Sequence, residues 1–400
     1  MATINILSLS LLCLSIGFGS ARILSPREFE QVALSGELAP FTIEYLKQRA
    51  DGEKKYSYGY SGFNCPTLDA DPPKDVHSLA PKYVSVIAAM GDSLTAANGA
   101  KAYTLPGVAL QYRGVSFSIG GDGDLDSTLT LPNIIRKYNS ALFGASKRVT
   151  VTVDEEMWSQ LNVGIPGSQA SDMPSQADLL IKRLGKRTKY QDKWKLVTLF
   201  IGANDICECE TQKDPDQLVS EWTGHIAQAL DILADGLNNT FVNLVNVINV
   251  AELRPYEYYK YCSLTHKSYC PCNLAKDSRR NQTDVIIRKY QHAMYDVAKR
   301  YENRSNFAVV LQPYSQDIII PTVHKHGNKT EPDLSFLAPD CFHFSRWAHA
   351  AAAAGLWNNM VQPLQNKQEF IDPAEINILC PDPKCPYFRT AVNSVLCSAA

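Results

Sequence analysis

The chain has 400 residues, of which 45% are hydrophobic and 20% are charged. This is the composition of a folded protein, because disordered chains combine low hydrophobicity with high net charge. Lys and Arg number 39 and Asp and Glu number 41, which leaves a formal net charge of −2. With no basic excess to neutralise phosphates, the sequence argues against nucleic acid as a partner.

The N-terminus carries an apolar run typical of a signal peptide. Residues 4–18 read INILSLSLLCLSIGF, and the small residues Gly19, Ser20 and Ala21 follow. The run is too short to span a bilayer, so we predict a signal peptide over 1–21 that is cleaved near Ala21. The alternative is a buried N-terminal helix. Since no later stretch is long and apolar enough to cross a membrane, the mature chain is expected to be soluble, secreted and without a transmembrane segment.

Cysteine usage agrees with export. Ten of the 11 cysteines lie beyond the predicted signal peptide: Cys65, Cys207, Cys209, Cys262, Cys270, Cys272, Cys341, Cys380, Cys385 and Cys397. This even number predicts up to five disulfides. The alternative, zinc held by two CxC pairs, departs from the CxxC spacing of structural zinc sites. Acceptor sequences for N-glycosylation occur at Asn238, Asn281, Asn303 and Asn328.

The chain divides into an extension, a main domain and a tail. Residues 22–75 are polar and turn-rich, and residues 366–400 are rich in Pro and Cys. Between them, over 76–365, short apolar runs predict buried strands at 82–90, 195–201, 241–250 and 307–311. Apolar residues at helical spacing predict helices over 176–184, 216–237, 284–301 and 347–361. This alternation indicates a parallel sheet, in which ligands bind at the carboxyl ends of the strands.

A candidate nucleophile follows the first strand. Gly91-Asp92-Ser93-Leu94 stands at a predicted strand-to-helix turn, which would expose the Ser93 hydroxyl at the edge of the sheet. Backbone N–H groups at a helix start favour negative charge, as the oxyanion of an acyl-transfer intermediate requires. The alternative is a simple helix cap, because Asp and Ser are both common there.

Three further segments supply the partners that a serine nucleophile needs. Asn204 follows the second strand, where its side-chain N–H can donate to the oxyanion, and the backbone N–H of Gly167 is a second candidate donor. Asp340 precedes His343 by three residues, so the carboxylate can orient the imidazole that accepts the Ser93 proton. Taken singly, each of these residues also fits a structural role. Their order along the chain favours catalysis.

These motifs resemble the four blocks of the GDSL, or SGNH, hydrolases, whose catalytic Ser, Gly, Asn and His map to Ser93, Gly167, Asn204 and His343. The segments 112–123, 172–177, 198–202, 241–245, 270–272, 338–345 and 356–360 are similar to the animal phospholipase B branch. The resemblance implies an α/β protein with the three-layer α/β/α (flavodoxin-like) fold and a five-stranded parallel sheet. It also implies hydrolysis of acyl esters in phospholipids and lysophospholipids, without a metal or other cofactor, at a lipid aggregate or membrane surface.

Other site chemistries find little support in the sequence. It contains neither the G-x-S-x-G of α/β-hydrolases nor an H-E-x-x-H zinc motif. Asp122, Asp124 and Asp126 imitate the start of a calcium loop, but Ser127 and Asn133 stand where Gly and Glu are needed. Two alternative functions stay open: an esterase of the same fold that removes acetyl groups from carbohydrates, and a non-catalytic lipid-binding protein.

Overall fold

The computed structural model describes residues 38–66, 69–208, 213–272, 279–325 and 329–397. The predicted signal peptide over 1–21, Cys209 and the glycosylation acceptor Asn328 lie outside the described residues.

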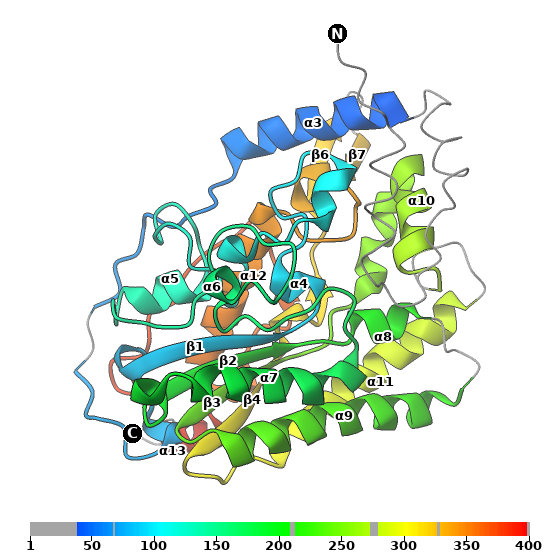
Figure 1. The fold of residues 1–400 in the computed structure, drawn as a ribbon. Coiled ribbons are helices and arrows are strands. Elements are labelled where there is room, and N and C mark those ends of the chain that lie inside the picture. The colour runs from blue at the N-terminus through cyan, green and yellow to red at the C-terminus, as the bar shows by residue number, and fades with distance from the viewer. Residues whose placement is uncertain (1–37, 67–68, 209–212, 273–278, 326–328, 398–400) are drawn as a thin grey trace.

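A parallel sheet of four strands forms the centre of the fold (Figure 1). The strands adjoin in chain order: β1 (Val84–Gly91), β2 (Trp194–Phe200), β3 (Thr240–Val245) and β4 (Phe307–Gln312). Nearly all of their residues are buried, which explains why they read as continuous apolar runs. Because the strands are parallel, their carboxyl ends meet at one edge, where the sequence places its candidate site residues.

Among the described residues, this sheet has four regular strands where five were expected. The free edge of β1 is instead lined by two short irregular segments, which contact it through isolated parallel bridges at Phe143 and Asn162. In the second segment, Val163 N–H donates to Ala89 O at 2.9 Å and Ile165 N–H donates to Gly91 O at 3.0 Å. These segments occupy the position of a fifth strand, and the second continues directly into the loop that contains Gly167.

The third predicted strand ends earlier than expected. The apolar run extends to residue 250, but β3 ends at Val245. Just beyond the strand, Asn246 N–H still donates to Gln312 O at 3.1 Å, while its side-chain amide donates to Gln316 Oε1 at 2.6 Å and to Gln291 O at 3.2 Å. A tertiary contact of this kind leaves no mark in the local hydrophobic pattern.

Helices cover both faces of the sheet, as a three-layer α/β/α fold requires (Figure 1). The crossover helices α7 (Met173–Gly185), α9 (Pro215–Gly236) and α11 (Arg280–Lys299) pack side by side on one face. The opposite face is covered by α5 (Leu131–Arg136) and α12 (Arg346–Val361). The fold class and the four long helices predicted from the sequence are therefore confirmed.

The remaining helices and strands are short, apart from α3. They are α3 (Leu38–Lys55), α4 (Ser93–Ala96), α6 (Glu156–Ser159), α8 (Ala203–Cys207), α10 (Lys260–Tyr269), α13 (Ala391–Leu396), β5 (Asp317–Ile318), β6 (Thr322–Lys325), β7 (Lys329–Pro332) and β8 (Phe370–Ile371). Strands β5 and β8 form a parallel pair, and β6 and β7 form an antiparallel pair. Within the described ranges, no helix combines the length and the apolar character needed to cross a bilayer.

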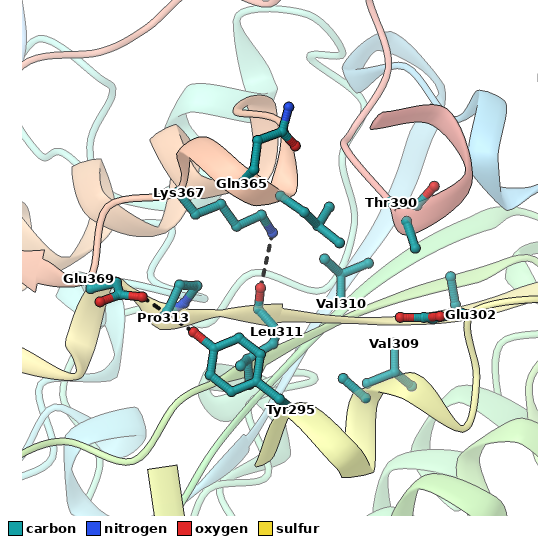
Figure 2. Close-up of a pocket in the computed structure, with 14 residues that line it drawn as sticks. Tyr295, Glu302, Val309, Val310, Leu311, Pro313, Gln365, Lys367, Glu369 and Thr390 are labelled. Atoms are coloured by element: carbon teal, nitrogen blue, oxygen red, sulfur yellow. Dashed lines mark hydrogen bonds between the residues drawn. The ribbon is translucent and has the colours of Figure 1, made fainter. Parts of the chain in front are cut away.

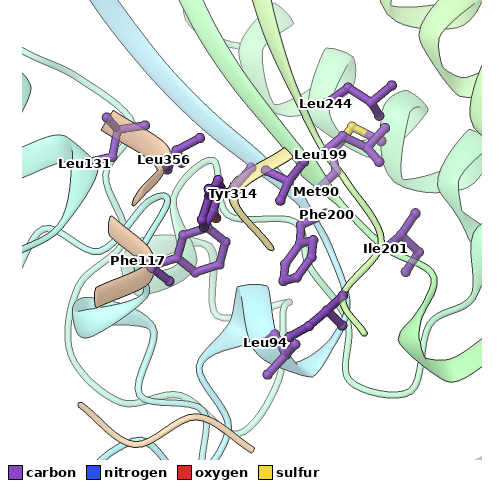
Figure 3. Packing of buried hydrophobic residues seen from close by; sticks show 14 of the residues in the cluster. Met90, Leu94, Phe117, Leu131, Leu199, Phe200, Ile201, Leu244, Tyr314 and Leu356 are labelled. Atoms are coloured by element: carbon purple, nitrogen blue, oxygen red, sulfur yellow. The ribbon is translucent and has the colours of Figure 1, made fainter. Parts of the chain in front are cut away.

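Aromatic side chains pack among aliphatic ones in the core that includes α12 (Figure 3). Phe117 and Phe200 meet edge to face with ring centroids 5.7 Å apart, an arrangement that aromatic pairs favour. Helix α12 approaches Tyr314 closely because position 355 is glycine. A Cβ atom there would lie 2.6 Å from a ring carbon of Tyr314.

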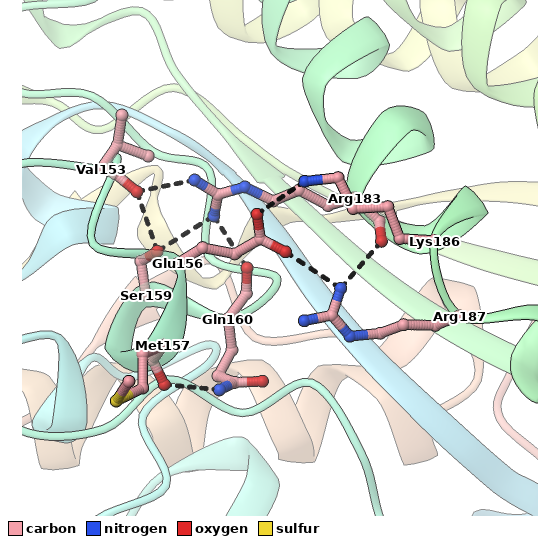
Figure 4. Close-up of polar contacts among 8 residues, drawn as sticks. All are labelled: Val153, Glu156, Met157, Ser159, Gln160, Arg183, Lys186 and Arg187. Atoms are coloured by element: carbon pink, nitrogen blue, oxygen red, sulfur yellow. Dashed lines mark hydrogen bonds and ion pairs between the residues drawn. The ribbon is translucent and has the colours of Figure 1, made fainter.

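Polar contacts fix the segment that precedes the Gly167 loop (Figure 4). Glu156 in α6 pairs with Lys186 and Arg187 at the end of α7, each at 3.0 Å. Arg183 in α7 donates to the carbonyl oxygens of Val153 and Gln160 at 2.6 and 2.8 Å. The irregular segment beside β1 is thus bound to a helix of the central fold.

The N-terminal extension contains a helix that its polar sequence did not reveal. Helix α3 buries Tyr45 and Arg49 on one face. Arg49 donates to Ala100 O at 3.1 Å and to Ser335 O at 3.4 Å, and the Tyr45 hydroxyl donates to Leu337 O at 3.3 Å. This polar face satisfies backbone carbonyls, so α3 lacks the apolar stripe by which amphipathic helices are recognised.

One disulfide joins the extension to the tail, two lie within the main domain and one lies within the tail, among the residues that the structure describes. Four pairs lie within the described residues: Cys65–Cys380, Cys207–Cys270, Cys262–Cys341 and Cys385–Cys397. Cys272 is also disulfide-bonded. The tail follows α12, where the indole N–H groups of Trp347 and Trp357 donate to tail carbonyls at 3.1 and 2.7 Å. The domain boundaries at residues 75 and 365 stay predictions.

A cavity of about 300 Å³ lies beside the outer strand β4 (Figure 2). Lys367 extends into it and donates to Leu311 O at 3.0 Å and to Gln312 Oε1 at 2.8 Å. A carbonyl on the open side of an outer strand can pair with a strand of another chain. Lys367 hydrogen-bonds to such a carbonyl in β4, which makes that pairing less favourable.

Candidate active site

The residue proposed as the nucleophile begins helix α4 directly after β1. Gly91 ends the strand with φ +149°, and a Cβ atom there would lie 2.2 Å from the carbonyl oxygen of Phe200. Glycine is therefore required for the chain to turn at this point. Asp92 caps α4 by accepting a hydrogen bond from Leu94 N–H at 2.8 Å. Ser93 is only 7% exposed, and its own N–H lies in the first turn, where a helix offers no internal acceptor.

The structure brings Ser93, His343 and Asp340 into one hydrogen-bonded chain. Ser93 Oγ and His343 Nε2 are 2.8 Å apart, and His343 Nδ1 lies 2.5 Å from Asp340 Oδ2. An ionised carboxylate only accepts hydrogen bonds, so the proton of a neutral imidazole resides on Nδ1. Nε2 is then the acceptor for the Ser93 hydroxyl. This arrangement can move a proton from Ser93 to His343 during attack on a carbonyl carbon.

Asp340 is held in its charged form by its surroundings. The carboxyl group is fully buried, and its second oxygen accepts the backbone N–H groups of Phe342 and His343 at 3.1 Å each. Burial raises the pKa of this carboxyl, but its electrostatic interaction with the His343 ring and these hydrogen bonds outweigh burial and leave the pKa below its ordinary value. Asp340 therefore stays ionised and accepts the hydrogen bond from His343 Nδ1.

Gly167 lies in a tight turn attached to the end of β1. Ser168 N–H donates to Ile165 O at 3.1 Å, which closes the turn over Pro166 and Gly167. Gly167 has φ +82°, and a β-turn with Pro at its second position commonly needs such a residue at the third. Ile165 N–H donates to the carbonyl of Gly91, so the turn that carries Gly167 is connected to the strand that carries Ser93.

Asn204 lies in helix α8 and contacts the same turn. Its side-chain Nδ2 donates to Ser168 O at 2.8 Å. One of the two amide hydrogens thus holds the turn in place, and the second is the candidate donor to an oxyanion. The predicted donors are therefore linked to each other through Ser168 and to the turn that carries Ser93 through Gly91.

The sequence reasoning missed Gln176, a buried residue of α7 that joins these two parts. Its Oε1 accepts Gly91 N–H at 2.9 Å, while its Nε2 donates to Gly91 O at 2.8 Å and to Ser168 Oγ at 3.1 Å. Gln176 is 1% exposed. The sequence does contain a signal for this contact, because Gln176 is a polar residue on the buried face of an amphipathic helix. A buried amide needs hydrogen-bond partners.

Two further buried carboxyl groups flank the site. Asp205 accepts a hydrogen bond from Ala170 N–H at 3.0 Å, just beyond the Gly167 turn. Burial raises the pKa of Asp205 to about 7 and that of Asp92 to about 6. Because each carboxyl also accepts a backbone N–H, Asp92 is held in a fixed position beside Ser93, and Asp205 beside Asn204.

The residues suggested for metals have other partners. Cys207 is paired with Cys270 in a disulfide, which leaves these two cysteines of the CxC pairs unable to serve as thiolate ligands. In the calcium-like loop, Asp122 accepts Arg148 N–H and Asp124 accepts the N–H and hydroxyl of Ser127. Over the part of the chain that the structure describes, no group of three or more His, Cys, Asp or Glu residues is arranged to hold a metal ion.

Comparison with known proteins identifies relatives of this chain. Residues 87–356 match the family model described as GDSL-like lipase/acylhydrolase. Similar proteins are called phospholipase B1, membrane-associated: that of Homo sapiens is 38% identical over 333 residues, which is 81% of this chain and 22% of that protein. The Mus musculus protein is 36% identical over 81% of this chain and 22% of its own length. The Rattus norvegicus protein is 35% identical over 84% of this chain and 24% of its own length. The chain thus spans less than a quarter of these relatives.

Proposed function

Since the chain belongs to the GDSL-like lipase/acylhydrolase family, we propose that it hydrolyses acyl ester bonds of phospholipids and lysophospholipids. The observation that carries the proposal is the hydrogen-bonded chain from Ser93 through His343 to Asp340. In this proposal Ser93 is the nucleophile, His343 is the general base and acid, and Asp340 orients the imidazole.

The reaction proceeds in two acyl-transfer steps. Ser93 Oγ attacks the ester carbonyl carbon while His343 Nε2 takes its proton, and collapse of the tetrahedral intermediate expels the alcohol, which takes that proton from His343. Water then attacks the acyl-Ser93 ester, again with His343 as the base. The fatty acid leaves and the Ser93 hydroxyl is restored.

The oxyanion of each intermediate is stabilised by N–H groups around the Gly167 turn. The proposed donors are the backbone N–H groups of Ser93 and Gly167 and the side-chain amide of Asn204. The contacts that Asn204 and Gln176 make with Ser168 support this assignment, because they fix the turn before substrate arrives. Preorganised donors cost no reorganisation during the reaction.

The substrate class and the location rest on the relatives and on the disulfides. The similar proteins are named as membrane-associated phospholipases, and we extend their substrate class to this chain. Its disulfides are typical of an oxidising compartment, so we propose a secreted enzyme that acts at a lipid aggregate or membrane surface. Asn238, Asn281 and Asn303 are exposed, as glycan attachment in the secretory pathway requires.

The direct test measures fatty acid released by the purified protein. Phosphatidylcholine and lysophosphatidylcholine vesicles are compared with an acetylated sugar, and Ser93→Ala serves as the control. We expect fatty acid from both lipids and none from the variant. Preferential release of acetate from the sugar would contradict the substrate class, and lipid binding without hydrolysis of any ester would contradict the enzymatic function.

A further inference from the structure

We propose that helix α10 positions the acid–base pair, with Cys341 and His266 as positioning residues for His343. This inference rests on the proposed function and adds to it the elements that hold the base in place. Neither residue reaches the reacting atoms; both act through the loop from Asp340 to His343.

The loop between the acid and the base has an unusual backbone that needs support. Cys341 lies between Asp340 and His343 and has φ +60°, in the left-handed region that non-glycine residues rarely adopt. The loop closes on itself through Cys341 N–H to Ala338 O at 2.9 Å and Ala338 N–H to His343 O at 2.7 Å. Such a conformation persists only when surrounding structure fixes it.

Helix α10 contacts this loop at two points. Cys262, near the start of the helix, forms a disulfide with Cys341. One turn further along, His266 Nε2 donates to the carbonyl oxygen of Cys341 at 2.8 Å. The disulfide therefore fixes the side chain of Cys341, and the hydrogen bond fixes its peptide unit.

The chemistry of His266 indicates that this hydrogen bond is its polar function. The ring is completely buried, and burial lowers its pKa, so the imidazole is neutral. A carbonyl only accepts, which assigns the proton to Nε2. Among the described residues, Nδ1 has no hydrogen-bond partner. If position 266 only had to fill space, an apolar side chain would do so without leaving a buried nitrogen unpaired. The hydrogen bond to the Cys341 carbonyl is therefore the reason that this position needs an N–H donor.

The far end of α10 is attached to the oxyanion side of the site. Cys270 forms a disulfide with Cys207, the last residue of α8, the helix that carries Asn204. Beside it, the ring of Tyr269 stacks on Phe342 and meets His343 edge to face, with centroids 5.4 and 5.7 Å apart. Helix α10 thus joins the acid–base loop to the helix of the proposed oxyanion donor.

The contact with His266 can be removed and restored selectively. His266→Leu keeps the volume but removes the donor, whereas His266→Gln places an amide N–H close to the position of Nε2. Since a displacement of about 1 Å at a reacting group can cost roughly a hundredfold in rate, we expect His266→Leu to lower kcat by about tenfold or more. KM for a soluble short-chain ester should change much less, and His266→Gln should recover most of the lost kcat.

The disulfide is tested with a matched pair of double variants. Cys262→Ser/Cys341→Ser removes the connection to the loop. Cys385→Ser/Cys397→Ser removes a disulfide of the tail, which closes a sequence separation of only 12 residues. We expect the first variant to lose kcat with little change in KM, and the second to keep both values.

The experiment measures kcat and KM on p-nitrophenyl butyrate, the rate of labelling by a fluorophosphonate, and urea unfolding of each full-length variant. Urea unfolding identifies the folded fraction, so that rates refer to folded protein. Equal losses in His266→Leu and His266→Gln, or wild-type kcat and labelling rates in His266→Leu, would overturn the inference. A wild-type protein that hydrolyses no ester and takes no label would instead overturn the proposed function.

Discussion

The side-chain amide of Gln176 forms hydrogen bonds to both backbone groups of Gly91, the residue two positions before Ser93. Its remaining N–H donates to Ser168 Oγ, next to Gly167. One buried side chain therefore fixes the turn that carries Ser93 relative to the turn that carries Gly167.

Gln176→Leu should lower both stability and turnover. The Gly91 N–H loses its acceptor in a buried position, which costs about 1–3 kcal/mol in the free energy of unfolding. Displacement of the two turns should reduce kcat about tenfold to a hundredfold, with a smaller effect on KM. Urea unfolding and ester hydrolysis measure the two effects. The control is Gln217→Leu on the exposed surface of α9; kcat in Gln176→Leu equal to that of this control would contradict the positioning role.

Asn204→Ala should reduce kcat by roughly 10²- to 10³-fold, the usual effect of losing one oxyanion donor. The substitution also removes the hydrogen bond to Ser168 O. Asn204→Asp keeps the size of the side chain but replaces its donors with acceptors, so it should be at least as slow. Steady-state kinetics on a soluble ester provide the measurement. Wild-type kcat in either variant would rule out Asn204 as a donor to the transition state.

Asp205 should make stability depend on pH. Burial raises the pKa of the Asp205 carboxyl in the folded state to about 7 from its ordinary value of 3.8, so the folded state binds more protons than the unfolded state between these two values. The contribution of Asp205 to the free energy of unfolding is then fully present below about pH 4 and is lost as the pH rises toward 7. Asp205→Asn does not show this loss. Its free energy of unfolding relative to wild type should therefore rise with pH, by up to about 1.4 kcal/mol per pH unit within that window.

Urea unfolding at pH 5 and pH 8 measures this difference. The control is Asp178→Asn, because Asp178 lies exposed on α7 and its carboxylate stays in water. A difference between Asp205→Asn and wild type that is equal at the two pH values would show that Asp205 does not titrate in this range.

Much of the fold was predictable because local patterns determine it. The four strands are apolar runs buried on both faces, and the long helices have apolar residues at helical spacing. Membership of the GDSL family and similarity to phospholipase B were also predicted from motifs and are confirmed. The number of regular strands was wrong, since the segments around Phe143 and Asn162 form only isolated bridges.

What escaped prediction depends on contacts between distant residues. Helix α3 was missed because its buried face carries Arg49 and Tyr45, which bond to carbonyls about 50 to 290 positions away. Gln176 was recognised only as part of a helix and a motif, since its partner Gly91 lies 85 positions earlier. The pairing of Cys262 with Cys341 could not be deduced from spacing either.

The most direct test of the central claim is to identify the residue that a fluorophosphonate labels. Peptide mass spectrometry of the labelled protein should find one adduct per chain, on Ser93. Labelling should be absent in Ser93→Ala and strongly slowed in His343→Ala, because in the proposed mechanism His343 Nε2, 2.8 Å from Ser93 Oγ, activates the hydroxyl. An adduct on another residue, or undiminished labelling of Ser93→Ala, would contradict the account.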